Sequence, residues 1–316
     1  MTAQVAEPDA VITLPWCDIS AILGVVRRGS GDPTYRIEGV GAGRAIWKGW
    51  RTPEGPVTVR LATQTADGRP VGVMAWCWGN GSHWIAQALP RMLGGKDDAT
   101  GFVAHHPEVE EAQRRHAGWA VPWTGLVVES LVPAIIEQRI TGAEAFTSYR
   151  RLVRAYGEPA PGVGADRGLM VAPDARGWAS IPSWAWVRAG IDASRSDTIM
   201  RALRVAHRLE EHAVDDPATA TARLRAVPGI GVWTAAEVAH VALGDADAVS
   251  FGDYHVAKNI GWALTGEEVD DHGLERLLAP YAGHRYRVQR LLELSGAMRP
   301  RRGPRRTLPT HLPTRW

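Results

Sequence analysis

A short loop between two helical patterns holds the residues whose spacing most directly suggests chemistry. The segment 224–243 reads as two helices joined by the tetrapeptide PGIG at 228–231. Its proline ends the first helix, and its glycines permit a left-handed backbone and close approach of another molecule. The amides of Gly229, Gly231 and Val232 then stand at the start of the second helix, where free N–H groups favour a phosphate. The same turn can also be a plain connector between helices.

Three side chains near this loop could act on a ligand held there. Trp233 and Glu237 lie four residues apart, hence on one helix face. Asp253 follows in the segment SFGDYHVAKN, and a fixed carboxylate can stabilise positive charge or orient a water molecule. Each has a plainer interpretation: a core tryptophan, a solvated helix charge, and an N-cap of the predicted helix 254–264. The cap and the chemical role of Asp253 are compatible, since a cap would hold the carboxylate rigidly.

The hairpin closely resembles that of the helix-hairpin-helix DNA glycosylases, whose pattern is roughly L-P-G-[IV]-G-x-x-T-A. The matching residues are 227–231 and then Thr234-Ala235. The family's essential aspartate sits in a Gly-Asp-x-x-[VIL] setting, which Gly252, Asp253 and Val256 reproduce. Its flanking helices resemble LVPAIIEQRITGAEAF upstream and LAPYAGHRYRVQRLLELSG downstream. The resemblance covers about residues 107–298, and the nearest branch is the 3-methyladenine DNA glycosylase II type.

The resemblance implies a base-excision reaction on damaged duplex DNA. Cleavage of the N-glycosidic bond passes through an oxocarbenium-like sugar, which Asp253 would stabilise while it orients or deprotonates the attacking water. Trp233 stands where bifunctional members carry a lysine, so no Schiff base and no strand-cleaving step are expected. An alkylated, cationic purine would gain cation–π attraction on the Trp233 ring. The expected enzyme is therefore a monofunctional glycosylase of damaged, alkylated purines.

The resemblance also assigns the remaining site residues, some of which depart from the family pattern. Glu237 replaces a common aromatic, makes the base pocket more polar, and could hydrogen-bond a base edge. Gln138 and Arg139 match the helix-end pair that enters the gap left by the flipped nucleotide. In the family a leucine or another wedge residue commonly follows the glutamine, so Arg139 is a second departure. Arg139 can instead reach a phosphate or be a plain surface charge. Tyr281 is expected as an aromatic wall of the pocket, and the residues expected to contact DNA are Gln138, Arg139, Gly229, Gly231, Val232 and Thr234.

Composition limits the other possibilities. The formal net charge is only +2, which is permissive for a polyanion without indicating one. No apolar run approaches the roughly 20 residues of a membrane span, and no secretory signal is evident at the N-terminus. A cytoplasmic, DNA-associated monomer is expected. Two cysteines cannot hold a four-cysteine cluster, and no cofactor or dedicated metal is expected; the family resemblance allows a sodium or potassium ion on hairpin carbonyls.

The elements that must position these residues divide the chain into three parts. Residues 1–106 read as an antiparallel sheet domain with a helix, because short β-branched and aromatic runs alternate with turn signals. Residues 107–298 show helical spacing and form a mostly α-helical glycosylase core. Residues 299–316 are a basic, proline-rich tail that would be disordered. The expected class is α+β, with the strands drawn from 21–29, 34–40, 44–50, 56–64 and 71–79 and a helix start at Pro122.

Two alternative functions follow from the departures at Glu237 and Arg139. One is a glycosylase for deaminated or oxidised bases, although Trp233 argues against a lyase-coupled oxidised-guanine enzyme. The other is a DNA-damage-binding protein without turnover. Retention of Asp253 argues against this second alternative, because binding alone does not need that carboxylate.

Overall fold

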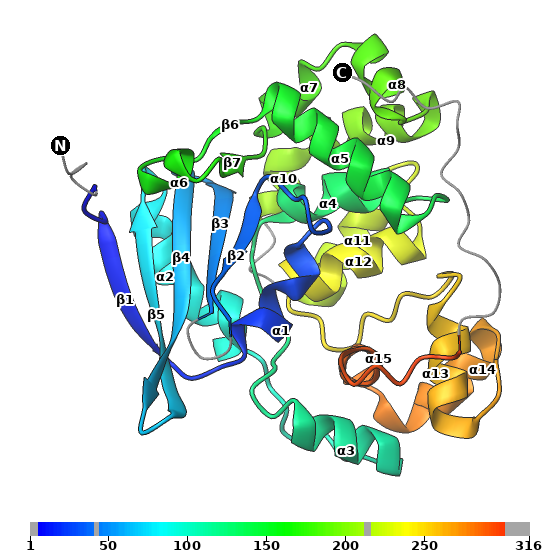
Figure 1. Cartoon of the computed structure of the whole chain (residues 1–316). Coiled ribbons are helices and arrows are strands. Elements are labelled where there is room, and N and C mark those ends of the chain that lie inside the picture. The colour runs from blue at the N-terminus through cyan, green and yellow to red at the C-terminus, as the bar shows by residue number, and fades with distance from the viewer. Residues whose placement is uncertain (1–5, 41–43, 212–215, 301–316) are drawn as a thin grey trace.

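The computed structural model describes residues 6–40, 44–211 and 216–300. An antiparallel five-stranded sheet lies on one side of the molecule and helices fill the other, as Figure 1 shows. This confirms the predicted α+β class with an N-terminal sheet. The strands pair in the order β1-β5-β4-β3-β2 and are β1 (Ala10–Pro15), β2 (Tyr35–Glu38), β3 (Ala45–Thr52), β4 (Gly55–Ala66) and β5 (Arg69–Trp78).

Tight turns set the register of the sheet. The β4–β5 hairpin closes through Asp67 and Gly68, both with positive φ (50° and 74°). Two successive positive φ angles are the signature of a type I′ turn, whose twist matches that of paired strands. The inward face of the sheet then packs on helix α2 (Ser82–Pro90), with Ile46, Val59 and Leu89 fully buried.

The prediction of a strand at 21–29 was wrong. This segment forms helix α1 (Ile19–Leu23) and a 3-10 turn, η1 (Gly24–Val26). The physical reason lies just upstream, where the Asp18 carboxylate accepts hydrogen bonds from the amides of Ser20 and Ala21 at 3.0 Å. Such an N-cap satisfies free helix donors and overrides the β-branched composition of the segment.

The rest of the described chain is mainly helical. The predicted helix after the sheet is α2, and its continuation, the π-helical turn η3 (Arg91–Gly95), contains Gly94 at φ +91°. A small two-stranded sheet pairs β6 (Glu158–Pro159) with β7 (Met170–Val171). The further helices are α3 (Pro107–Arg115), α4 (Val127–Ile136), α5 (Gly142–Tyr156), α6 (Val163–Asp166), α7 (Ala175–Ala179), α8 (Ser183–Ala189), α9 (Ala193–Arg204), α10 (Ala206–Glu211), α11 (Pro217–Arg225), α12 (Val232–Ala242), α13 (Val256–Thr265), α14 (Asp271–Leu278), the 3-10 turn η4 (Ala279–Tyr281) and α15 (Arg285–Leu294).

Helix α4 begins at Val127, five residues later than the predicted start at Pro122. The amide of Thr124 instead donates to the carbonyl of Val241 in α12, at 3.0 Å. The first α4 amides, those of Val127 and Val128, donate to the Glu210 carboxylate at 2.9 and 2.8 Å. A carboxylate from a distant helix therefore caps α4, which sequence spacing could not show.

Two helical cores surround the hairpin that the sequence singled out. Helices α4, α5, α8, α9, α11 and α12 share one buried apolar cluster, and α13, α14 and α15 share another with Val109 of α3. Figure 1 shows α13–α15 as a separate group of helices beside α11 and α12. The loop that carries Asp253 connects α12 to α13, so it joins the two groups. Across the described residues, no helix has both the length and the apolar character that a membrane crossing requires.

Candidate active site

The predicted helix–turn–helix is present, with α11 and α12 joined through 226–231. Gly229 has φ +97°, and a Cβ there would lie 2.3 Å from Thr198 Oγ1, so this position requires glycine. At Gly231, by contrast, an added Cβ would have no atom within 4 Å. Helix α12 has no side-chain cap at its start, and Val232 is 47% exposed. The arrangement therefore leaves the α12 N-terminus accessible to an anion.

Gln138 ties the end of α4 to this hairpin. Its side-chain amide donates to the carbonyl of Gly229 at 3.1 Å and to Thr234 Oγ1 at 2.8 Å. Thr234 is 2% exposed, so its side chain supports the hairpin from inside. Because its hydroxyl is buried and accepts from Gln138, Thr234 could contact a duplex only through its backbone, and the predicted DNA contact of this residue stays a prediction.

Arg139 lies on the surface directly beside Gln138. Its φ of +60° is left-handed, a conformation it shares with one other non-glycine residue in the described chain, Asp67. A side chain in this region costs roughly 1–2 kcal/mol. Such strain persists only where surrounding structure imposes it and is concentrated at functional sites. The exposed, strained position is compatible with the predicted DNA contact of Arg139.

Asp253 and Trp233 meet in the structure. The indole Nε1 of Trp233 donates to Asp253 Oδ2 at 3.2 Å. The other carboxylate oxygen, Oδ1, accepts from the amides of His255 and Val256 at 2.7 and 3.1 Å. Helix α13 begins at Val256, two residues later than predicted, and its N-cap residue is His255 rather than Asp253. The two amide contacts still fix the partly exposed Asp253 carboxylate in orientation.

Glu237 lies in the same region, one turn beyond Trp233. Its Oε1 accepts a hydrogen bond from Ser250 Oγ at 2.6 Å, and its Oε2 lies 3.8 Å from His240 Nε2. The side chain is partly buried, with 28% of its surface exposed. Burial raises the pKa of Glu237 to about 7, with the charges of Glu293 and Asp253 adding to the effect. A carboxyl group that accepts from Ser250 and is only partly exposed differs from a fully solvated helix charge.

Two residues that the sequence did not single out, Glu137 and Arg28, join this group. Burial raises the pKa of the Glu137 carboxyl, and the nearby charges of Glu237 and Asp253 raise it further, while Arg28 opposes the shift. Arg28 Nε lies 3.5 Å from Glu137 Oε1. The carboxyl groups of Asp253, Glu237 and Glu137 thus lie in one region with Arg28, an arginine from the N-terminal part of the chain. Glu137 could have been noticed beside Gln138, whereas nothing in the sequence around Arg28 links it to the site.

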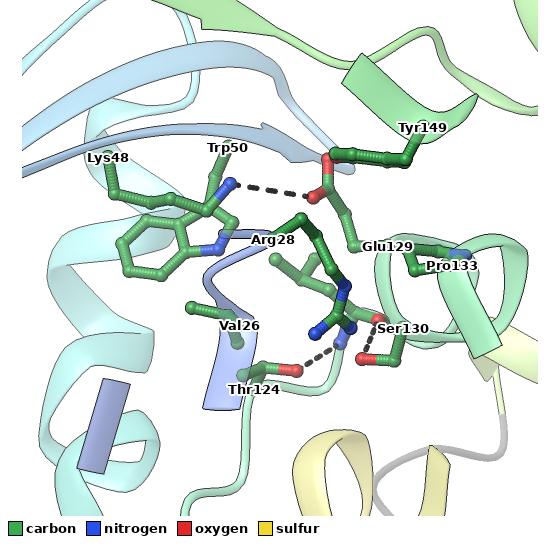
Figure 2. Close-up of a pocket in the computed structure, with 10 residues that line it drawn as sticks. Val26, Arg28, Lys48, Trp50, Thr124, Glu129, Ser130, Pro133 and Tyr149 are labelled. Carbon is green, nitrogen blue, oxygen red and sulfur yellow. Dashed lines mark hydrogen bonds and ion pairs between the residues drawn. The ribbon is translucent and has the colours of Figure 1, made fainter. Parts of the chain in front are cut away.

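Arg28 also lines a small polar cavity between the sheet and α4, shown in Figure 2. On its sheet side, the buried Lys48 points toward the Glu129 carboxylate at 3.9 Å and donates to Thr34 Oγ1 at 2.9 Å. Burial lowers the pKa of Lys48, and Glu129 opposes that shift. Arg28 therefore belongs both to the acidic group around Asp253 and to the polar contact between sheet and helices.

Tyr281 is not part of the site. It is 2% exposed within the α13–α15 core, and its hydroxyl binds the His105 amide at 3.0 Å and His106 Nδ1 at 2.7 Å. The expected role as a pocket wall is corrected, because the ring faces the segment before α3. Of the predicted basic tail, Arg299 pairs with Glu268 at 2.8 Å, and residues 301–316 lie outside the described residues. Within the described chain no group of three metal-binding side chains comes together.

No family model and no curated protein matches this sequence. Solved structures do match in fold. A 3-methyladenine DNA-glycosylase from Archaeoglobus fulgidus superimposes with a TM-score of 0.71 at 16% identity, covering 91% of this chain and 98% of that one. An 8-oxoguanine glycosylase/lyase from Clostridium acetobutylicum, without DNA, gives 0.64 at 11% identity, covering 91% and 99%.

The same Clostridium enzyme bound to double-stranded DNA, with cytosine opposite 8-oxoguanine, gives a TM-score of 0.63 at 10% identity, covering 93% and 100%. The chain therefore has the fold of the helix-hairpin-helix DNA glycosylases, as the sequence resemblance predicted. Within that fold, the similar structures include enzymes named for an alkylated and for an oxidised purine. The fold alone thus leaves the substrate open.

Proposed function

We propose that this protein is a monofunctional DNA glycosylase that excises damaged, alkylated purines from duplex DNA by base flipping. The observation that carries the proposal is the placement of Asp253, whose carboxylate is fixed by two backbone amides and by Trp233, close to the α12 N-terminus. A carboxylate held in this way stabilises the developing oxocarbenium charge at the sugar without reorganising during the reaction. Phosphates of the duplex would meet the open hairpin at Gly231.

The monofunctional assignment is supported by the lysines. The sequence contains three, Lys48, Lys96 and Lys258. Lys48 is buried against the sheet, the Lys96 ammonium lies 5.2 Å from the Trp123 ring, and the Lys258 ammonium packs 3.8 Å from the Tyr254 ring centre. A strand-cleaving mechanism needs an amine that attacks the sugar carbon. Trp233 occupies the place beside Asp253 instead, and its ring suits stacking on a cationic purine.

The test is release of free base from methylated duplex DNA by the wild type and by Asp253→Asn. We expect the wild type to release 3-methyladenine or 7-methylguanine and to leave strands that break only after alkali. Asp253→Asn should be at least about a hundredfold slower, while Asp270→Asn, the same change at the cap of α14, should match the wild type. A DNA adduct trapped by borohydride would contradict the monofunctional assignment, and binding without release by the wild type would favour damage binding alone.

A further inference from the structure

The carboxyl group of Glu237 lies one helical turn beyond Trp233 in α12. It lies on the helix face that presents Trp233, whose indole contacts Asp253. Its accessible fraction of 28% shows that the group is not sealed in the core. The Ser250 hydroxyl, 2.6 Å from Oε1, fixes the rotamer. The mechanism predicted from the sequence gives this group a possible hydrogen bond to a base edge and no proton transfer.

The groups around Glu237 favour its neutral form. Glu293 of α15 and Asp253 of the α12–α13 loop add negative charge, and Arg28 after η1 opposes them. Glu137 at the end of α4 and Tyr286 of α15 also feel the charge of Glu237. Burial is the largest influence, and with these charges it raises the pKa of Glu237 to about 7. A carboxylic acid that is protonated near neutral pH can donate that proton.

His240 supports the same protonation state. Its ring stacks on Tyr286 with centroids 4.0 Å apart, and its Nδ1 lies 3.4 Å from the Ala248 carbonyl. Burial lowers the pKa of His240 to about 4, so the ring is neutral, and an Nδ1–H facing the carbonyl leaves a lone pair on Nε2. Nε2 lies 3.8 Å from Glu237 Oε2, too far for a hydrogen bond. A neutral ring at this distance adds no positive charge that would favour the carboxylate form of Glu237.

We propose that Glu237 is a general acid that protonates the departing purine, so that the enzyme excises neutral damaged purines, such as deaminated ones, as well as cationic alkylated ones. This proposal rests on the proposed glycosylase function. In the step, the bond between the sugar C1′ and N9 breaks and its electron pair moves into the base. The Glu237 proton passes to a ring nitrogen of the purine, while water adds to C1′ and gives its proton to Asp253. Solvent then returns Glu237 to its acid form and Asp253 to its carboxylate.

The charge of the lesion decides whether this acid is needed. A purine alkylated on a ring nitrogen is already cationic and leaves as a neutral molecule. A neutral purine would leave as an anion unless it gains a proton, and general acid catalysis of such a step contributes typically about 10²–10⁴-fold. Glu237 should therefore matter for neutral lesions and be dispensable for cationic ones. The cationic lesion provides an internal control within the same active site.

The experiment compares single-turnover release of hypoxanthine and of 7-methylguanine from matched duplexes by the wild type and by Glu237→Gln. We expect Glu237→Gln to slow hypoxanthine release by about a hundredfold or more and to leave 7-methylguanine release within about threefold. Glu108→Gln, an exposed change on α3, should affect neither. For the wild type, hypoxanthine release should fall as pH rises above about 7, because the acid form is lost, whereas 7-methylguanine release should not follow that profile.

Each other outcome has a distinct meaning. Equal losses on both lesions in Glu237→Gln, or a wild-type hypoxanthine rate that is flat between pH 6 and 9, would overturn the acid role. Release of 7-methylguanine alone by the wild type would also overturn it, while leaving the glycosylase function intact. Release of neither base by the wild type would instead refute the proposed function itself. The wild-type pH profile requires no substitution, so the test stands even if Glu237→Gln folds poorly.

Discussion

The indole of Trp233 donates a hydrogen bond to the carboxylate of Asp253 across 3.2 Å. The two residues come from the first turn of α12 and from the loop before α13. A hydrogen bond therefore connects the second helix of the hairpin, α12, directly to the Asp253 carboxylate. Because the amides of His255 and Val256 donate to the opposite oxygen, the carboxylate is held at both of its oxygens.

Removing the indole N–H should loosen Asp253. Trp233→Phe keeps an aromatic ring for base stacking, although a smaller one, and loses the donor to Oδ2. A hydrogen bond to a charged group contributes about 1.5–3 kcal/mol, so we expect base release to slow by about ten- to a hundredfold with DNA affinity nearly unchanged. Single-turnover rates and a binding titration measure the two effects. Trp184→Phe, at an exposed tryptophan of α8, is the control; an unchanged rate in Trp233→Phe would mean that the indole does not orient the carboxylate.

The two hairpin glycines should respond differently to alanine. Gly229→Ala combines a left-handed φ with a Cβ 2.3 Å from Thr198 Oγ1, and we expect a loss of about 2 kcal/mol or more in the free energy of unfolding. Gly231→Ala meets no atom and has an ordinary φ of −89°, so stability should stay within about 0.5 kcal/mol. Urea unfolding measures both.

The DNA affinity of Gly231→Ala distinguishes the two interpretations of this hairpin, a phosphate-binding site or a plain connector between helices. If the α12 N-terminus receives a phosphate, the methyl group of Gly231→Ala should weaken duplex binding although the protein is fully folded. Binding equal to the wild type would instead indicate that the turn only connects α11 and α12.

Arg139→Gly should make the folded protein more stable and weaken its binding to DNA. Glycine adopts the φ of +60° without the roughly 1–2 kcal/mol cost of a side chain. This gain in stability is partly offset because glycine has greater conformational freedom in the unfolded chain. We expect a rise of a few tenths to about 1 kcal/mol in the free energy of unfolding, together with weaker binding to lesion-containing duplexes. Equal binding by the variant would contradict a DNA-contacting role, and Arg139 would then be a plain surface charge.

His240 should make the protein less stable in mild acid. Its pKa falls from 6.5 to about 4 on folding, so between these values the unfolded chain binds more protons than the folded one. Stability from this group is therefore complete above about pH 6.5 and is lost as pH falls toward 4, amounting to about 3 kcal/mol at roughly 1.4 kcal/mol per pKa unit. His240→Phe keeps the ring against Tyr286 and should remove this contribution.

The measurement is urea unfolding of the wild type and His240→Phe at intervals from pH 4.5 to 7.5. Glu237 contributes with the opposite sign, because its folded pKa is raised to about 7 and its charged form is disfavoured as pH rises. The difference between the two proteins isolates the histidine. A difference that does not change with pH would show that His240 does not titrate on unfolding.

The sequence by itself determined the features that depend on local backbone conformation. The glycine spacing at 228–231 and the helical patterns on either side specified the hairpin, since only certain residues allow a helix to end and restart there. The same is true of the turn signals that divide the sheet into hairpins. Asp253 could be singled out because the family pattern that contains it consists of neighbouring residues, from Gly252 to Val256. The β-branched composition of 21–29 predicted a strand there, but the Asp18 side chain caps a helix, α1, in its place.

The tertiary structure decided which side chains face one another. Gln138 binds Gly229 although 91 residues separate them in sequence, and Arg28 reaches Glu137 from another part of the chain. Tyr281 points inward, where its hydroxyl accepts from the His105 amide and is hydrogen-bonded to His106 Nδ1. Such contacts follow from how helices and sheet pack, which fixes distances that no sequence spacing encodes. The raised pKa of Glu237 also depends on tertiary structure, because burial and neighbouring charges from several elements set it together.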